Sequence, residues 1–100
     1  MGSDRQRIKE DHVMELRREA GLWLRELREH AKLSQRALAE KVGLDYYTFV
    51  SQIEAGRGRI PPDKYLAWAI AVGMEPAAFV RNILRFYEPG TYDILFPQES

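Results

Sequence analysis

Apolar residues recur at three- and four-residue steps along much of this chain, with charged residues between them. The first such stretch covers residues 4–31, and its apolar stripe consists of Ile8, Val13, Leu16, Ala20, Leu24, Leu27 and Ala31. This period matches one face of an α-helix. The pattern therefore predicts an amphipathic helix over residues 4–31, which Gly21 can divide into an N-terminal arm and a first helix proper.

Two short helices joined by a tight turn are predicted over residues 33–56. Ser34 is a good N-cap for the first helix, because its hydroxyl can accept from the free N–H groups of the first turn. Gly43 ends that helix, Asp45 can cap the second, and Gly56 stops it. The second helix is expected to turn Phe49, Val50 and Ile53 to one side and Tyr47, Thr48, Ser51, Gln52 and Ala55 to the other.

The polar side of the second short helix would cover a core poorly. Tyr, Thr, Ser and Gln suit the base edges in a DNA major groove, which offer donors, acceptors and a thymine methyl. The predicted base-reading residues are Tyr46, Tyr47, Thr48, Ser51 and Gln52. Gln52 is the best candidate, since a glutamine amide can form two hydrogen bonds with adenine.

This pair of helices resembles the helix-turn-helix of the phage repressor and Cro family, also called the XRE family. The resemblance rests on Leu33-Ser34-Gln35, Leu38-Ala39, Val42-Gly43-Leu44 and Ile53-Glu54-Ala55-Gly56, and with the flanking helices it covers residues 24–73. It implies an all-α, five-helix lambda-repressor-like DNA-binding domain, here with an N-terminal helical extension and a short extended C-terminal tail. The chain has one residue more than the family between the turn glycine and Glu54, which leaves the base-reading register open by one position.

The resemblance also implies roles for residues outside the second short helix. The positions that match Arg28 and Glu54 form an ion pair in the family, between the first helix and the end of the recognition helix. Ser34 and Gln35 match positions that touch DNA phosphates. The loop after Gly56 touches phosphates in the family as well, and its residues Arg57 and Arg59 suit this because arginine forks onto phosphate oxygens.

The C-terminal part of the chain carries more apolar residues than one small domain can easily bury. A helix is predicted over Asp63–Val72, a second over Ala77–Tyr87, and an apolar extended tail over Tyr92–Phe96. Because monomers rarely expose a large apolar patch, we expect a two-fold homodimer interface here. It would consist of Phe79, Ile83, Phe86, Tyr87, Tyr92, Ile94 and Phe96. The alternative is that the tail closes its own domain.

The 100 residues suit one domain, with an arm over 1–16, a helix-turn-helix core over 17–74 and a dimerisation segment over 75–100. The formal net charge is zero, which argues against a protein that coats nucleic acid without regard to sequence. The chain has no cysteine, and His12 and His30 fit no metal-ligand spacing, so no catalytic residue, metal or cofactor is expected. No run approaches the about 20 apolar residues of a membrane span, and a cytoplasmic protein is expected.

The sequence therefore predicts a sequence-specific double-stranded DNA-binding transcription regulator that acts as a homodimeric repressor. The alternative is a protein-interaction module on the same fold, either antitoxin-like or coactivator-like, with a protein partner. An enzyme is the weakest interpretation, because no nucleophile–base arrangement is visible.

Overall fold

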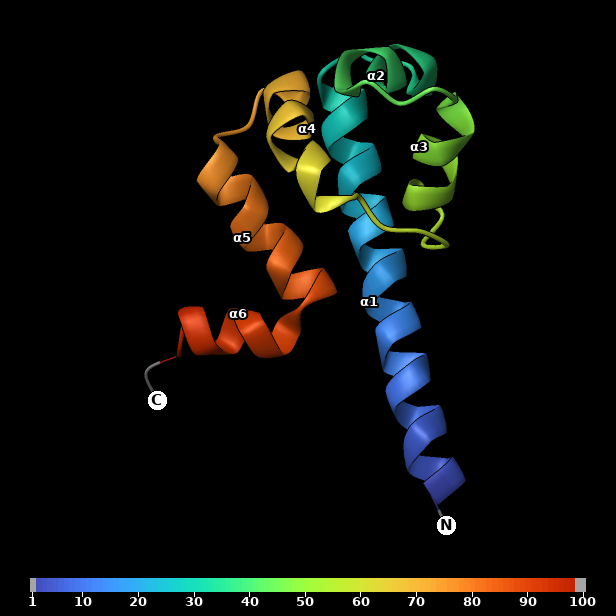
Figure 1. The fold of residues 1–100 in the computed structure, drawn as a ribbon, viewed down its shortest axis with the longest axis vertical. Helices are drawn as coiled ribbons and strands as arrows, with labels where there is room; N and C mark the ends of the chain where they lie inside the picture. The colour runs from blue at the N-terminus through green and yellow to red at the C-terminus, as the bar shows by residue number, and fades with distance from the viewer. Residues whose placement is uncertain (1, 99–100) are drawn as a thin grey trace.

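A computed structural model describes residues 2–98, and it leaves the side chains of residues 2–6 and 8 undescribed. Helices are the only regular elements in this range: α1 (Gly2–His30), α2 (Gln35–Val42), α3 (Tyr47–Glu54), the 3-10 turn η1 (Pro62–Lys64), α4 (Tyr65–Val72), α5 (Pro76–Tyr87) and α6 (Pro89–Leu95). Figure 1 shows α2, α3 and α4 gathered around one end of α1, with α5 beside its middle. The predicted all-α fold is confirmed.

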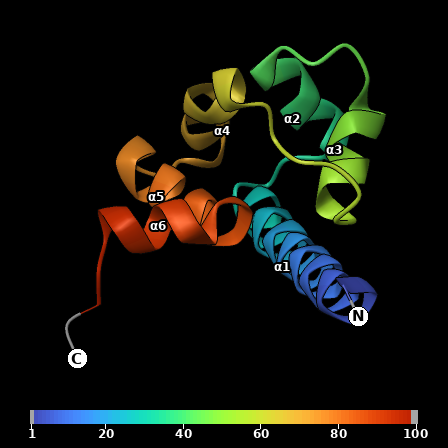
Figure 2. The ribbon, with the colours of Figure 1, turned by 60° about the horizontal axis from the view of Figure 1, so that its bottom comes forward.

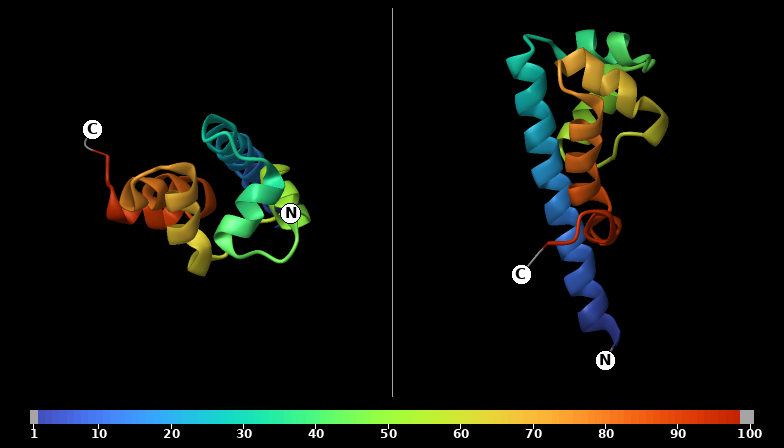
Figure 3. Two further views of the ribbon diagram at one scale, coloured as in Figure 1. Left: turned by 90° about the horizontal axis from the view of Figure 1, so that it is seen from above. Right: turned by 90° about the vertical axis from the view of Figure 1, so that its left-hand side faces the viewer.

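Helix α1 runs without a break through Gly21, so the predicted division into two segments is wrong. Its 29 residues span about 44 Å at the usual rise of about 1.5 Å per residue. The N-terminal half projects beyond the other helices (Figures 1 and 3), and residues 9–15 are all exposed. The Cα radius of gyration is 14.6 Å, above the about 13 Å of a compact chain of this length. The predicted stripe thus meets the core only from Ala20 onward, and its member Ile8 lies outside the described side chains.

The turn between α2 and α3 forms largely as predicted. The Ser34 hydroxyl accepts from the backbone N–H of Ala37, and Gly43 adopts the left-handed conformation with φ of 74°. The N-cap of α3, however, is Tyr46 and not Asp45, and no side chain caps this helix. Tyr46 itself is extended, with φ of −132° and ψ of 133°, immediately before α3 begins.

The core is a single cluster in which α1, α2, α3, α4 and α5 all take part. Its largest fully buried side chains are Trp68, Phe79, Leu24, Leu38, Ile60, Ile83 and Val50. Trp23 of α1 stacks on Phe79 with 5.6 Å between the ring centroids and also contacts Phe86 at 5.8 Å. These aromatic contacts join α5 to α1, so α5 is part of the domain and not an appendage.

Two expectations about the C-terminal segment are wrong. Residues 92–96 are not an extended tail, because α6 covers Pro89–Leu95 and crosses the end of α5 (Figure 2). Phe79, Ile83 and Tyr87 cannot form a dimer interface, since they are buried in the core of their own chain. Helix α1 packs against α5 and covers much of its apolar side. The sequence did not predict this contact.

Candidate nucleic-acid interface

Helix α3 presents most of the predicted base-reading side chains to solvent. Tyr46 is 65% exposed and Tyr47 43% exposed, and Thr48 and Gln52 are exposed as well. Ser51 is half-buried, because it lies toward the packed side of the helix. Val50 and Ile53 are buried and hold α3 against the core. Figure 2 shows α3 at the edge of the molecule, where an elongated partner can reach it.

A buried ion pair fixes the end of α3. Arg28 donates to the two carboxylate oxygens of Glu54, with 2.7 Å from Nε to Oε2 and 3.1 Å from Nη2 to Oε1. Its remaining Nη1 donates to the carbonyl of Leu33 at 2.8 Å. The hydrogen bond with Glu54 raises the pKa of Arg28. The ion pair that the resemblance implies is present, and it joins α1, the α1–α2 turn and α3 at one point.

Gln35 and Ser34, the predicted phosphate-binding residues of α2, both have structural contacts. The Gln35 amide Nε2 donates to Glu54 Oε1 at 3.1 Å, which ties the start of α2 to the same ion pair. The Ser34 hydroxyl is exposed while it caps α2. Since the first N–H groups of a helix have no partner within that helix, this corner still presents donors to an anion.

The loop after α3 holds its two arginines differently. Arg57 is exposed, whereas Arg59 forms an ion pair with Glu88, with 3.2 Å from Nη2 to Oε2, and lies 4.9 Å above the ring of Tyr87. The N–H of Ile60 donates to the Tyr87 hydroxyl at 3.1 Å. Burial raises the pKa of that phenol, which therefore remains a neutral hydrogen-bond partner. These contacts pin the loop to the end of α5 beside the exposed face of α3.

Phe49 is a surface residue that sequence reasoning missed. It was expected to face the core, yet it is 50% exposed, and its ring centroid lies 6.1 Å from that of Tyr46. A helical wheel gives the signal that could have found it, because Val50 and Ile53 already define the inward face and Phe49 lies at its margin. Arg36 of α2 lies 5.0 Å above the ring of Tyr47 and adds a cation to this aromatic surface.

The described residues contain no cluster of His, Cys, Asp or Glu that could hold a metal ion. None of the helices within residues 2–98 has the length and apolar character needed to cross a membrane.

The comparisons with known proteins point in one direction. A family model described as "Helix-turn-helix domain" matches residues 19–88, which is more than half of the chain. The comparison with curated proteins found no significant match. The matched range contains α2, the turn and α3 together with α4 and α5. The chain therefore belongs to the helix-turn-helix domain family, a family of DNA-binding folds.

Proposed function

We propose that this protein is a sequence-specific double-stranded DNA-binding transcription regulator. The observation that carries the proposal is the exposed row of Tyr47, Thr48 and Gln52 on α3, a helix whose far end is anchored by the buried Arg28–Glu54 pair. A rigid, short helix with polar side chains outward fits the major groove, which admits a single α-helix.

Base reading and backbone contact fall to different residues in this proposal. Gln52 pairs with adenine through its amide, and Thr48 and Ser51 contact neighbouring base edges. Arg57, Ser34 and Gln35 hold the register on phosphates, and the free N–H groups at the start of α2 assist them. Arg59 joins them when it exchanges Glu88 for a phosphate. We propose that the regulator acts as a repressor by occupying promoter DNA. We also propose that it is a cytoplasmic protein.

We further propose that the DNA-bound form is a two-fold homodimer. Because most of the α5 residues predicted for the interface are buried, other exposed apolar side chains must make the dimer contact, and the candidates are Ile94 and Leu95 on α6 and Val13 and Met14 on α1. Ile94 is 80% exposed, the highest value among the large apolar side chains. Figure 1 shows α6 at the level of the projecting half of α1. Covering these side chains in a dimer would also bury part of residues 9–15 of α1, which are all exposed.

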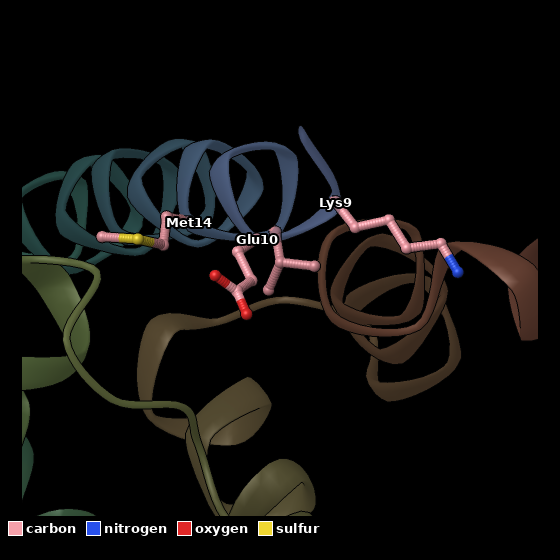
Figure 4. Close-up of a pocket in the computed structure, with 4 residues that line it drawn as sticks. Lys9, Glu10 and Met14 are labelled. Atoms are coloured by element: carbon pink, nitrogen blue, oxygen red, sulfur yellow. The ribbon is translucent and has the colours of Figure 1, made fainter. Parts of the chain in front are cut away.

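The projecting half of α1 carries a groove that fits this dimer proposal. It has a volume of about 470 Å³ and is lined by Lys9, Glu10, Val13 and Met14. Figure 4 shows Lys9 and Glu10 projecting from the helix, with Met14 one turn further along. Sedimentation tests the dimer: Ile94→Glu is expected to give a monomer, whereas Leu22→Glu, on an exposed leucine elsewhere on α1, is expected to leave the dimer intact. A monomeric wild-type protein would remove the dimer from the proposal.

The test of the main proposal is selection of bound duplexes from a random DNA library at near-physiological salt. We expect enrichment of a two-fold-symmetric site with half-sites about 10 base pairs apart. A single unpaired half-site would keep DNA reading and exclude the dimer geometry. Absence of enrichment, with protein shown to be folded by its helical circular dichroism, would overturn the proposed function.

One observation favours the alternative of a protein-interaction module. Leu66 and Ile70 lie one turn apart on α4 and are 59% and 66% exposed. A protein partner such as a toxin or a polymerase subunit could cover this pair. Co-purification of a partner that is lost in Leu66→Asp, together with absence of a selected DNA site, would favour this function over DNA reading.

A further inference from the structure

An apolar pocket lies between the recognition helix and the loop that follows it. Its volume is about 320 Å³, and its lining consists of Leu44, Phe49, Gln52, Ile53, Gly58, Arg59 and Pro61. Phe49 is one of its exposed lining residues and is 50% exposed. The Phe49 ring thus stands open to water beside the polar base-reading residues, while Val50 and Ile53 are buried beneath α3.

We propose that Phe49 and this pocket read the 5-methyl group of a pyrimidine base in the major groove, an inference that rests on the proposed function. The methyl of thymine is the apolar feature of the major-groove edge, and phenylalanine is among the side chains that suit it. 5-Methylcytosine carries the same group at the same position of the ring. The pocket therefore selects a pyrimidine that carries a 5-methyl group, whether that base is thymine or 5-methylcytosine.

The position of Phe49 relative to Gln52 supports this assignment. The two residues are three apart on α3, which places their Cβ atoms about 5–6 Å from each other on one side of the helix. Successive base pairs are about 3.4 Å apart along the duplex. A Gln52 amide on an adenine thus leaves Phe49 within reach of a pyrimidine methyl in the same or the next base pair.

Charge at the pocket rim argues for DNA as the occupant. Arg59, which is paired with Glu88, lines the pocket and Arg57 is exposed in the same loop, so an apolar group bound there has the cation of Arg57 nearby and that of Arg59 when it exchanges Glu88 for a phosphate. A base edge comes with phosphates that these cations match, whereas the apolar side chain of a protein partner does not. Gly58 contributes a wall without a side chain, and a Cβ there would make only ordinary contact with Ile53 at 3.8 Å.

The experiment uses the full chain and the duplex selected for it. Each thymine of one half-site is replaced singly by deoxyuridine, and each cytosine by 5-methylcytosine, and dissociation constants are measured by fluorescence anisotropy. We expect wild-type protein to lose about fourfold in affinity at one thymine, the factor for burying one methyl group. Phe49→Ala is expected to show no loss at that thymine. Leu66→Ala, which truncates an exposed leucine on α4, is the matched control and should keep the wild-type loss.

Each outcome decides the proposal. A fourfold gain on methylation of one cytosine, seen only when Phe49 is present, would also support it and would name the other source of the methyl. Equal losses in wild type and Phe49→Ala would assign the methyl to another residue and overturn the proposal. If no single pyrimidine replacement changes the affinity of the wild-type protein, the proposal is overturned as well. The existence of a selected site would in that case still support the DNA-binding function. If Phe49→Ala turns the dimer into a monomer and no pyrimidine replacement changes the affinity, the proposal is overturned. The pocket would then bind a second copy of the chain.

Discussion

Gly21 of α1 lies directly against the backbone of Glu54 at the end of α3. A Cβ built on Gly21 would stand 2.7 Å from the carbonyl carbon of Glu54 and would overlap its oxygen. The backbones of the two helices are thus in direct contact. This contact lies next to the Glu54 carboxylate, which accepts a hydrogen bond from Arg28. This close approach sets the position of α3 relative to α1 as directly as the ion pair does.

Gly21→Ala is expected to destabilise the protein despite the better helix propensity of alanine. The added methyl must push α3 away from α1, at a cost of about 1–3 kcal/mol in the free energy of unfolding. Gly90→Ala in α6 is the matched control, because a Cβ there meets open space and should leave stability unchanged or slightly higher. Urea unfolding followed by circular dichroism measures both. Equal stabilities of the two variants would contradict the close approach.

Glu54→Gln is expected to cost about 3–5 kcal/mol, since it leaves the buried guanidinium of Arg28 without its counter-charge. The double variant Arg28→Met, Glu54→Gln should recover part of that loss. Arg25→Ala breaks an exposed pair with Glu29, 3.4 Å from Nε to Oε2, and is expected to cost less than about 1 kcal/mol. Denaturant midpoints compare the three. Equal costs for the two single variants would show that burial does not matter here.

Gln52→Ala and Arg57→Ala are expected to weaken DNA binding in different ways. Loss of a base-reading amide relaxes the preference at one base pair by about 1–3 kcal/mol. Loss of a phosphate contact weakens all sequences alike and flattens the slope of log K against log salt by about one. Binding to the selected site and to single-base variants, at several salt concentrations, separates the two. If both variants lose affinity uniformly, the division of roles is wrong.

Glu88→Gln is expected to strengthen DNA binding. It frees Arg59 from its ion pair and removes a negative charge near the phosphate-facing loop. We expect a salt slope steeper by up to about one, because one more cation becomes available to a phosphate. Glu29→Gln, which removes an equal charge from the exposed pair with Arg25 on α1, should leave the slope unchanged. An unchanged slope in Glu88→Gln would mean that Arg59 does not contact DNA.

Acid should remove the contribution of Glu75 to stability. Its carboxylate caps α5 by accepting from the N–H groups of Ala77 at 3.0 Å and Ala78 at 2.8 Å, and these hydrogen bonds lower its pKa. A folded pKa below the unfolded value gives stability that is present above about pH 4.3 and is lost as pH falls through the folded pKa. The melting temperatures of wild type and Glu75→Ala should therefore differ at pH 7 and converge in acid. Glu75→Asp, which keeps a good cap, should follow the wild-type profile.

Local patterns in the sequence predicted much of the helix-turn-helix itself. The Ser34 cap, the left-handed Gly43 and the end of α4 at Gly73 depend on residues within one helical turn of each other. Residue types at such short range limit the backbone strongly, so they can be interpreted without knowing the fold. The Arg28–Glu54 pair spans 26 residues and was predicted only through the resemblance to the family.

The predictions for the C-terminal segment failed because they depended on which surfaces meet. Residues 92–96 have the composition of an extended arm, yet Arg81 lies 4.8 Å above the ring of Phe96 and α6 packs on α5 as a helix. The apolar surplus of α5 was interpreted as a dimer interface, because the sequence could not show that Trp23 of α1 covers Phe79 and Phe86.

By itself, the sequence determined where α2 begins and ends, that a second short helix follows the turn, and which polar residues that helix offers. Only the tertiary structure decided that Arg59 is held by Glu88, that Phe79 and Ile83 are buried, and that Ile94 and Leu95 on α6 are exposed. The physical reason is that capping and periodicity act over a few residues, whereas exposure is set by the neighbour that arrives from a distant part of the chain.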